Sequence, residues 1–401
     1  RAGPEPEGRG PWARIIHRTF LTEAGVGDGL VYNHMAMLES LKEGRLVAAW
    51  QSSAVQERWH DQHLRLAYSH DAHGLEWKPA ENPAWGVNPN ENLAVCCPVL
   101  HRPAGTGAVW AFFGRTEPAC NAPGGDIVRV VRDPNTGAWS EAEVIFGFND
   151  DIKVNKVVAN RVTVLSTGEW VLPYWRTFSA HKECPELSER AVKTCGVLIS
   201  VDGGRSWSEH SAPTVEPRLI EQTVVELMPS RTLLMLCRTL AGHVYETRST
   251  DGGRTWTDAR PINDLPNPNS KVAAVRLSPP ARAPDRNVIA LAFNDHTEDE
   301  PCEKCRTHLK LALRLISDAD AAAGESRGQW TRALTLADGD VPGLRHHYPT
   351  LLELPGAPEG TRFVAAIFST GFAQGHETTR QAKQTRQGIE YVLVQIGGVF
   401  S

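Results

Sequence analysis

The feature that most constrains the fold of this chain is an eight-residue segment that occurs twice. Residues 200–207 read Ser-Val-Asp-Gly-Gly-Arg-Ser-Trp, and residues 249–256 read Ser-Thr-Asp-Gly-Gly-Arg-Thr-Trp. Each copy follows a strand-like run, and Asp-Gly-Gly is typical of a tight hairpin turn with positive φ angles. The Asp can accept backbone N–H groups, and the Trp can fill the gap between neighbouring sheets. A turn repeated at sheet-sized intervals predicts a repeat architecture.

Weaker copies extend this pattern along the chain. Residues 69–77 contain a copy that is one residue longer, residues 133–139 keep the Asp, Gly and Trp, and a stretched version runs over residues 317–330. The tryptophans that end the five segments are separated by 62, 68, 49 and 74 residues. These intervals match a four-stranded propeller blade of roughly 40–50 residues with its loops.

The segments between these turns repeat one unit of alternating apolar strands, which occurs six times. We expect innermost strands at residues 34–39, 95–100, 157–165, 223–227, 272–277 and 349–354. We expect second strands at 46–50, 109–113, 170–175, 232–237, 288–293 and 363–368, and third strands at 64–69, 127–132, 195–200, 243–249, 308–317 and 389–395. The fold class predicted is therefore all-β, a six-bladed β-propeller of four-stranded antiparallel blades.

The ends of the chain complete this prediction. The sixth unit lacks an Asp-Gly turn, and a strand at residues 14–20 would supply its outer strand and close the ring without free sheet edges. We expect residues 1–11 to be a disordered lead-in and residues 12–401 to form a single propeller domain, which would be the catalytic domain.

Composition narrows the classes of partner. The 401 residues carry a net charge of −5 with no basic run, which argues against nucleic acid as the main partner, and no run of 18 apolar residues predicts a membrane span. The eight cysteines favour a secreted or organellar lumen over the cytoplasm. They are interpreted as buried or loop cysteines. Cys302 and Cys305, with His296 and His308 nearby, offer an alternative zinc site that lacks a second cysteine pair.

The functional face can be located from the topology. In a propeller the first strands begin, and the second strands end, on the face opposite the Asp-Gly turns. Three second strands end in Arg-Thr, at Arg115, Arg176 and Arg238, and Lys156 opens the third inner strand. We expect these basic side chains to converge on the central axis, where guanidinium groups suit a carboxylate ligand.

The whole layout resembles the sialidase-like superfamily of six-bladed propellers, whose Asp box is Ser-x-Asp-x-Gly-x-Ser/Thr-Trp. The resemblance covers residues 31–395 and is nearest to sialidase-like BNR-repeat proteins. Phrases shared with that branch are Val-Asn-Lys at 154–156, Leu-Pro-Asn-Pro-Asn-Ser at 265–270, Arg-Thr-His-Leu at 306–309 and Tyr-Pro-Thr-Leu at 348–351.

The resemblance implies a set of site residues. Sialidases hold the substrate carboxylate with three arginines and use a tyrosine nucleophile, a glutamate that activates it and an aspartate acid/base. Carried over by position, Tyr348 resembles the nucleophile and Glu221 its partner, Arg238 and Arg306 resemble two of the arginines, and Asp61 resembles the acid. A neutral Tyr activated by a carboxylate avoids the repulsion that an acidic nucleophile would meet beside the substrate carboxylate.

One departure from the family pattern keeps alternatives open. Where sialidases open the first blade with Phe-Arg-Ile-Pro, residues 33–36 read Asn-His-Met-Ala, so His34 takes the place of the first arginine. A histidine there resembles propeller enzymes that act on rhamnosyl-glucuronate ends by hydrolysis or β-elimination, with Lys156, Arg176 and Tyr348 as its partners. Such a base needs a pKa near neutral, as histidine ordinarily has.

The sequence therefore predicts an exo-acting, sialidase-like glycosidase that removes a terminal carboxylate-bearing sugar from an acidic glycan or oligosaccharide. The alternatives are a glucuronate-directed lyase or hydrolase that uses His34, and a non-catalytic propeller that binds glycan or protein. None of these three predicted functions requires a cofactor. A structural calcium ion on the axis is compatible with such propellers, although no Asp-rich loop calls for one.

Overall fold

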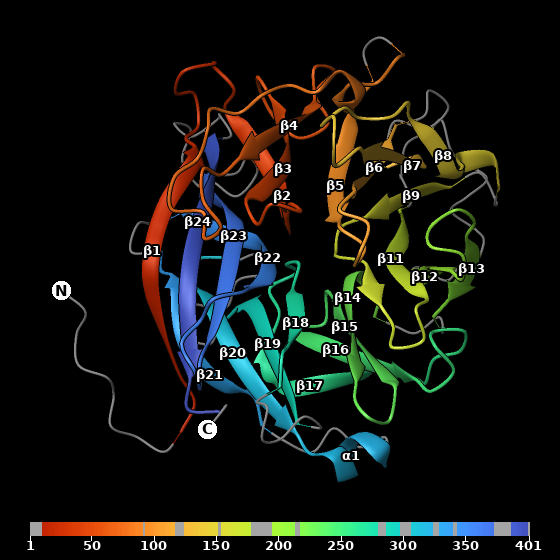
Figure 1. Ribbon diagram of the computed structural model, residues 1–401, viewed down its shortest axis with the longest axis vertical. Helices are drawn as coiled ribbons and strands as arrows, with labels where there is room; N and C mark the ends of the chain where they lie inside the picture. Colours follow the sequence, from red (N-terminus) through yellow and green to blue (C-terminus); the bar gives the residue numbers. More distant parts are fainter. Residues whose placement is uncertain are drawn as a thin grey trace.

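The computed structural model describes residues 10–90, 93–116, 124–150, 154–177, 195–212, 217–279, 286–296, 306–323, 329–339, 343–372 and 386–399. Within these ranges six antiparallel sheets are arranged around a common centre, which confirms the predicted propeller (Figure 1). Each sheet is one blade, and the chain traces it from the inner to the outer strand, except that the last sheet takes its outer strand from the beginning of the chain.

The blades follow one another along the chain. Blade 1 contains β2 (Tyr32–Ser40), β3 (Leu46–Ser53) and β4 (His63–Tyr68), and blade 2 contains β5 (Val95–His101), β6 (Val109–Arg115), β7 (Asp126–Arg132) and β8 (Glu143–Phe146). Blade 3 contains β9 (Asn155–Val158), β10 (Thr163–Val164), β11 (Trp170–Thr177), β12 (Cys195–Ser200) and β13 (Ser208–Ser211). Short 3-10 helices lie at η1 (Ala84–Gly86) and η2 (Phe148–Asp150).

The second half continues the series. Blade 4 contains β14 (Ile220–Leu227), β15 (Thr232–Arg238), β16 (His243–Ser249) and β17 (Arg260–Pro266), and blade 5 contains β18 (Ala273–Leu277), β19 (Asn287–Asn294), β20 (Leu309–Ile316) and β21 (Thr331–Ala337). Blade 6 is built from β22 (Arg345–Leu354), β23 (Arg362–Phe372), β24 (Arg386–Gly397) and β1 (Trp12–Thr22).

The ring is closed as the sequence predicts. Strand β1 pairs antiparallel with β24, from Trp12 opposite Gly397 to Thr22 opposite Ile389. In Figure 1 the red first strand lies beside the blue last strands. The first strand of the chain is therefore the outer strand of the last blade, and the two ends of the chain hold the ring together. The edge of β24 that faces away from the centre is paired with β1 and is not left free.

Three local predictions differ from the structure. Blade 1 has three strands, and only isolated bridges at Trp77 and Glu81 stand in for its outer strand. The expected inner strand at 157–165 is split into β9 and β10, because Asn160 between them donates its side-chain amide to backbone carbonyls of Glu221, Gln222 and Val272. The stretched copy at 317–330 begins instead as the short helix α1 (Asp318–Ala322), capped by Ser317.

The four other Asp-containing segments form the turns expected of them. In blade 4, Asp251 accepts the N–H groups of Arg254 and Thr255 at 3.0 and 2.9 Å, and Trp256 donates to the carbonyl of Gly253 at 2.9 Å. In blade 3, Asp202 and Trp207 make the same bonds. Asp71 and Asp133 likewise accept backbone N–H groups. The motif is therefore a turn clamp on the face opposite the strand ends that build the site.

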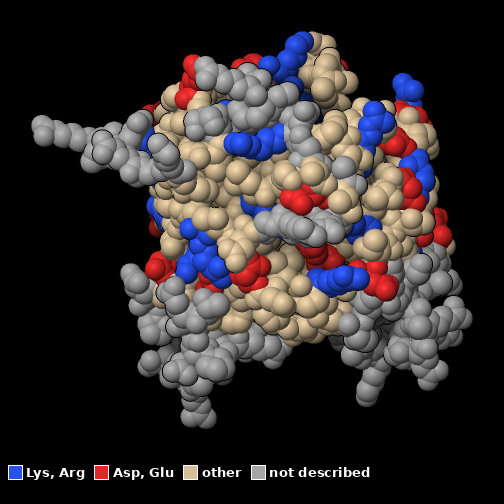
Figure 2. All heavy atoms as spheres, turned by 90° about the horizontal axis from the view of Figure 1, so that it is seen from below, with Lys and Arg blue, Asp and Glu red and all other residues tan. Residues whose placement is uncertain are grey.

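The core lies between neighbouring blades. Clusters of buried apolar side chains join blades 1 to 3, blades 4 and 5, blades 5 and 6, and blades 6 and 1. A further cluster reaches from blades 3 and 4 to the centre, where it includes Met35, Cys97 and Tyr348 from three other inner strands. Within the described ranges no helix is long and apolar enough to cross a membrane. On the side seen in Figure 2, acidic and basic side chains are interspersed.

Four inner strands carry the same backbone irregularity, which the sequence analysis did not predict. Strands β2, β5, β14 and β22 each shift register near their first residues. At each shift one residue that is not glycine has a positive φ: Met35 (58°), Cys97 (56°), Glu221 (49°) and Tyr348 (58°). A β-bulge of this kind re-aims a side chain, and such residues are uncommon outside turns and functional sites. Two of the four are predicted site residues.

Candidate functional site

The centre of the site is a hydrogen bond between side chains of two blades that are not neighbours in the ring. The Tyr348 hydroxyl, from blade 6, donates to Glu221 Oε1 of blade 4 at 2.9 Å. Blade 5 lies between these blades in the chain, so only convergence at the centre brings the two side chains together. Both residues occupy the inner-strand bulges and both are buried, with Tyr348 8% exposed and Glu221 5% exposed.

Two arginines flank this pair. Arg238 Nη1 donates to Glu221 Oε2 at 2.6 Å and also to the Tyr348 hydroxyl, while its Nε donates to Asn269 Oδ1 at 2.8 Å. The Arg306 guanidinium carbon lies 5.3 Å from the centre of the Tyr348 ring, and its Nη1 is 3.2 Å from His347 Nδ1. The structure therefore brings together four of the predicted residues, Tyr348, Glu221, Arg238 and Arg306.

Burial and charge set the protonation of this group. Burial raises the pKa of Tyr348 well above its ordinary value, in spite of the opposing charge of Arg238, so its phenol is neutral near pH 7. Burial lowers the pKa of Arg306 to about 10, and the charges of Arg238 and Arg345 contribute to that shift. Both guanidinium groups are thus positively charged at neutral pH, beside a neutral phenol.

His34 lies against the tyrosine but is neutral. Its ring centroid is 4.2 Å from that of Tyr348, and its Nδ1 is 2.7 Å from Ser369 Oγ. Burial lowers the pKa of His34 well below its ordinary value, and the positive charges of Arg306, Lys271 and Arg238 lower it further. A histidine in this position therefore cannot replace the positive charge of an arginine at neutral pH.

Three further basic residues surround the cluster, and the sequence analysis did not single them out as site residues. Lys271 is 1% exposed and donates to Pro349 O and, at 3.4 Å, to Thr350 Oγ1, just beneath Tyr348. Burial lowers its pKa to about 7. Arg218 lies near enough to Arg238 and Glu221 for both charges to act on its pKa, and Arg345 acts in the same way on Arg306 and His347. Arg345 directly precedes His346, His347 and Tyr348 in the sequence, and this position next to a predicted site residue could have indicated that Arg345 lies at the site.

The loop after β3 offers a different acid from the predicted one. Asp61 accepts the backbone N–H of Ala54 at 3.0 Å and so closes this loop on itself. Glu57, four residues earlier in the same loop, is exposed, yet desolvation raises the pKa of its carboxyl. The charge of Arg58 opposes this rise, and that of Glu221 adds to it. Its charge also acts on the pKa of Tyr348. The raised pKa of Glu57 and its electrostatic effect on Tyr348 make it a second candidate for the proton donor beside Asp61.

Three of the basic residues predicted to bind the substrate form ion pairs or hydrogen bonds with groups in or next to their own blade. Arg115 lies directly opposite Asp126 across β6 and β7 and forms an ion pair with it at 3.1 Å. Arg176 pairs with Glu209 of the same blade at 3.4 Å. Lys156 is fully buried and donates to Gly147 O and Phe148 O, at 2.8 and 3.2 Å. Of the three Arg-Thr strand ends, only Arg238 meets the tyrosine, because the bulge in β14 sets Glu221 beside it.

The described residues offer no support for the alternative zinc site or for a calcium ion on the axis. The described residues include no group of three or more His, Cys, Asp or Glu side chains able to hold a metal ion. Cys302 and Cys305, the core of the alternative zinc reading, lie outside the described residues. His308 instead pairs with Asp338.

The arrangement can perform a specific kind of chemistry. A neutral phenol hydrogen-bonded to a carboxylate is a nucleophile whose proton has an acceptor in place. The surrounding positive charges favour an anionic ligand, and planar guanidinium groups suit a carboxylate. Arg238 Nη2 makes no hydrogen bond to the described residues, so it keeps donors for such a ligand.

Comparison with known families and curated proteins adds an independent observation. A family model described as a BNR repeat-like domain matches residues 44–361, well over half of the chain. A curated protein, anhydrosialidase from Macrobdella decora, is 22% identical over 232 residues. That match covers 57% of this chain and 28% of the relative, so the matched part spans less than a third of the length of that protein.

Solved structures agree in fold. The intramolecular trans-sialidase from Ruminococcus gnavus superposes with a TM-score of 0.67 at 15% identity, covering 93% of this chain and 96% of that one. A protein of unknown function from Dyadobacter fermentans gives 0.63 at 16% identity, over 96% and 99% of the chains. The NanB sialidase of Streptococcus pneumoniae gives 0.67 at 13% identity, over 94% and 70%. At these identities the likeness establishes the fold.

Proposed function

Because this chain belongs to the BNR repeat-like domain family and has the sialidase-like propeller fold, we propose that it is an exo-acting glycosidase. Its substrate would be a glycan or oligosaccharide that ends in a carboxylate-bearing sugar, such as sialic acid or a related acidic sugar. The observation that carries this proposal is the hydrogen-bonded pair of Tyr348 and Glu221 with Arg238 and Arg306 beside it.

The proposed reaction begins at Tyr348. The phenol oxygen attacks the anomeric carbon while Glu221 takes the phenol proton, and the bond from that carbon to the leaving oxygen breaks. Glu57 supplies the proton that the leaving oxygen needs, and its raised pKa suits this task. Water then attacks the anomeric carbon while Glu57 takes a proton from the water, the bond from that carbon to the Tyr348 oxygen breaks, and Glu221 returns the phenol proton to Tyr348. Each step conserves protons among these three side chains, the leaving alcohol and water.

Substrate binding is assigned to the arginines. Arg238 and Arg306 would hold the sugar carboxylate, with Arg218 and Arg345 adding positive charge around them. Two charged side chains would thus do the work that three arginines do in the family pattern. We expect weaker binding of the carboxylate than a full triad would give, because a neutral His34 adds no charge.

The protonation of His34 weighs against the lyase alternative. A base that abstracts a proton next to a carboxylate works best with a pKa near the working pH. Burial and three neighbouring cations lower the pKa of His34 well below that range. We therefore assign His34 to positioning the Tyr348 ring, against which it packs.

The experiment that tests the proposal is a product assay on sialosides and glucuronate-ended oligosaccharides. We expect release of a free acidic monosaccharide by the parent protein and its loss in Tyr348→Phe. An unsaturated uronate that absorbs near 235 nm and disappears in His34→Ala would support the lyase reading instead. Binding without turnover of any acidic glycan would support a binding propeller.

A further inference from the structure

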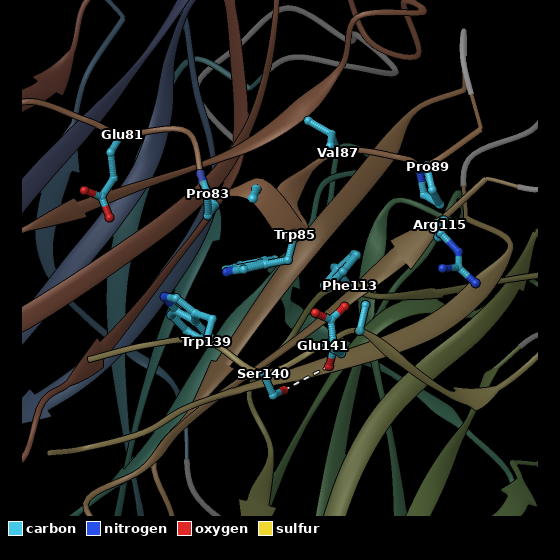
Figure 3. Close-up of a pocket in the computed structure, with 12 residues that line it drawn as sticks. Glu81, Pro83, Trp85, Val87, Pro89, Phe113, Arg115, Trp139, Ser140 and Glu141 are labelled. Carbon is cyan, nitrogen blue, oxygen red and sulfur yellow. Dashed lines mark hydrogen bonds between the residues drawn. The ribbon is translucent and has the colours of Figure 1, made fainter. Parts of the chain in front are cut away.

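A second pocket lies away from the axis, where the outer part of blade 1 meets blade 2. Its volume is about 640 Å³, within the range of sites that hold small ligands. It is lined by the connection after β4, by the end of β6 and by the turn that leads into β8 (Figure 3). None of the residues that build the axial cluster lines it, so this pocket is separate from that cluster.

Aromatic rings form one wall of this pocket. Trp85 and Trp139 lie 4.8 Å apart between ring centroids, and Phe113 lies 5.4 Å from Trp85. Trp85 and Trp139 are both half-buried, so each has one side in the core and another at the pocket surface. In Figure 3 the three rings stand side by side along the cavity. Phe113 is only 1% exposed, so the surface open to a ligand comes from Trp85 and Trp139, whose rings are tilted by 52° to each other. Indole faces of this kind suit the C–H face of a pyranose ring.

The polar groups around the rings set the charge of the ligand. Glu81 and Glu141, both exposed, present carboxylates on opposite sides of the aromatic wall. The positive charge of Arg115 is offset by its ion pair with Asp126. The lining therefore carries a net negative charge, which opposes an acidic sugar, while carboxylate oxygens accept hydrogen bonds from sugar hydroxyls.

We propose that this blade 1–blade 2 pocket binds a neutral sugar residue of a glycan. The pyranose would stack on Trp85 and Trp139, and its hydroxyls would donate to Glu81 and Glu141. The charge of this pocket is the opposite of that of the axial cluster, so the two sites would take different residues of a glycan. This inference concerns binding alone and stands whether or not the axial site performs the proposed reaction.

The test is binding of neutral oligosaccharides to the full chain carrying Tyr348→Phe, so that no turnover intervenes. Lactose and cellotetraose are titrated by calorimetry and by saturation-transfer NMR. We expect saturable binding of at least one of them at concentrations up to about 10 mM, with the C–H protons of the sugar ring receiving the strongest transfer. Glucuronic acid should not compete with it.

Two tryptophan substitutions test whether the sugar binds in this pocket or elsewhere on the surface. Ala142 is exposed and lines the pocket, so Ala142→Trp fills it from its rim without disturbing the core. Val201 is 68% exposed on a blade 3 turn, and Val201→Trp adds the same side chain elsewhere. We expect affinity to fall at least tenfold in the first variant and to stay unchanged in the second, with equal unfolding midpoints.

Three results would overturn this inference. The first is the absence of saturable binding of either sugar to the Tyr348→Phe protein. The second is affinity that survives Ala142→Trp unchanged, since the sugar would then lie elsewhere. The third is stronger binding of glucuronic acid than of the neutral sugars at this pocket, because the acidic lining would then not select against a carboxylate.

Discussion

Tyr348 and Glu221 show what single residues contribute here. The sequence places both at the start of inner strands, which is enough to predict that they share the functional face. Their direct bond depends on the bulge at each position, with φ angles of 58° and 49°, and neither residue type favours such an angle. Single-residue preferences therefore cannot predict this bond. The assignment of the acid to Asp61 stays a prediction, and Glu57 is a second candidate that only the folded loop reveals, because its pKa responds to the charges of Glu221, Arg238 and Arg306.

The acid assignment can be tested by a matched pair of substitutions. Glu57→Gln removes the proton donor and should lower kcat by about 10²–10⁴-fold on a glycoside with an alcohol leaving group. On an aryl glycoside, whose leaving group needs no proton, the loss should be much smaller. Asp61→Asn serves as the comparison and should change both rates by less than tenfold. A larger loss in Asp61→Asn than in Glu57→Gln would return the acid role to Asp61.

Lys271 predicts a pH dependence of stability. Its pKa falls from the ordinary 10.5 to about 7 through burial, so between these values the unfolded chain binds a proton that the folded protein has released. The free energy of unfolding therefore rises with pH across this window, by at most about 1.4 kcal/mol per pH unit, and this contribution is lost as pH falls through 7. Urea unfolding from pH 7 to 9 should show that Lys271→Met has a smaller slope than the parent. Equal slopes would mean that Lys271 titrates normally.

At the scale of elements, the Asp-box turns are the part of the fold that the sequence predicts most directly. Asp251 accepts two backbone N–H groups and the Thr255 hydroxyl, the last at 2.6 Å. The motif encodes these contacts within five residues. The split inner strand of blade 3 could not be predicted in this way, because Asn160 bonds to strands that lie about 60 and 110 residues further along the chain.

Removal of one Asp-box carboxylate should weaken the whole domain modestly. We expect Asp251→Ala to lower the free energy of unfolding by about 1–2 kcal/mol, since two N–H groups lose their acceptor. Asp258→Ala, seven residues later and also exposed, has no hydrogen bond or ion pair among the described contacts and serves as the control. Denaturant titration of both variants measures the difference. Equal losses in the two would mean that the turn clamp adds nothing to stability.

At the scale of the molecule, closure of the ring decides whether six blades form one unit. The sequence predicts this closure, because blade 6 lacks an outer strand and residues 14–20 have strand character. The register could not be predicted, since it depends on a close approach: a Cβ on Gly397 would lie 2.3 Å from Cζ2 of the Trp12 ring. The spacing of β1 and β24 therefore requires glycine at this point.

A substitution at that contact tests the closure. Gly397→Val should force β1 away from β24 and lower the free energy of unfolding by about 1–3 kcal/mol, with earlier hydrogen exchange in β1. Gly10→Val places the same side chain in open space near the same strand and should change little. Unaltered exchange of β1 in Gly397→Val would show that this contact does not hold the closing strand.

The site of a covalent intermediate tests the central claim, that a tyrosine at the axis carries the reaction. A fluorinated acidic glycosyl donor slows the second step, so the sugar should remain attached to the protein. Intact and peptide mass spectrometry are expected to find one added sugar, on Tyr348, and none in Tyr348→Phe. An adduct on another residue, or turnover of an acidic glycoside that survives Tyr348→Phe unchanged, would contradict the account.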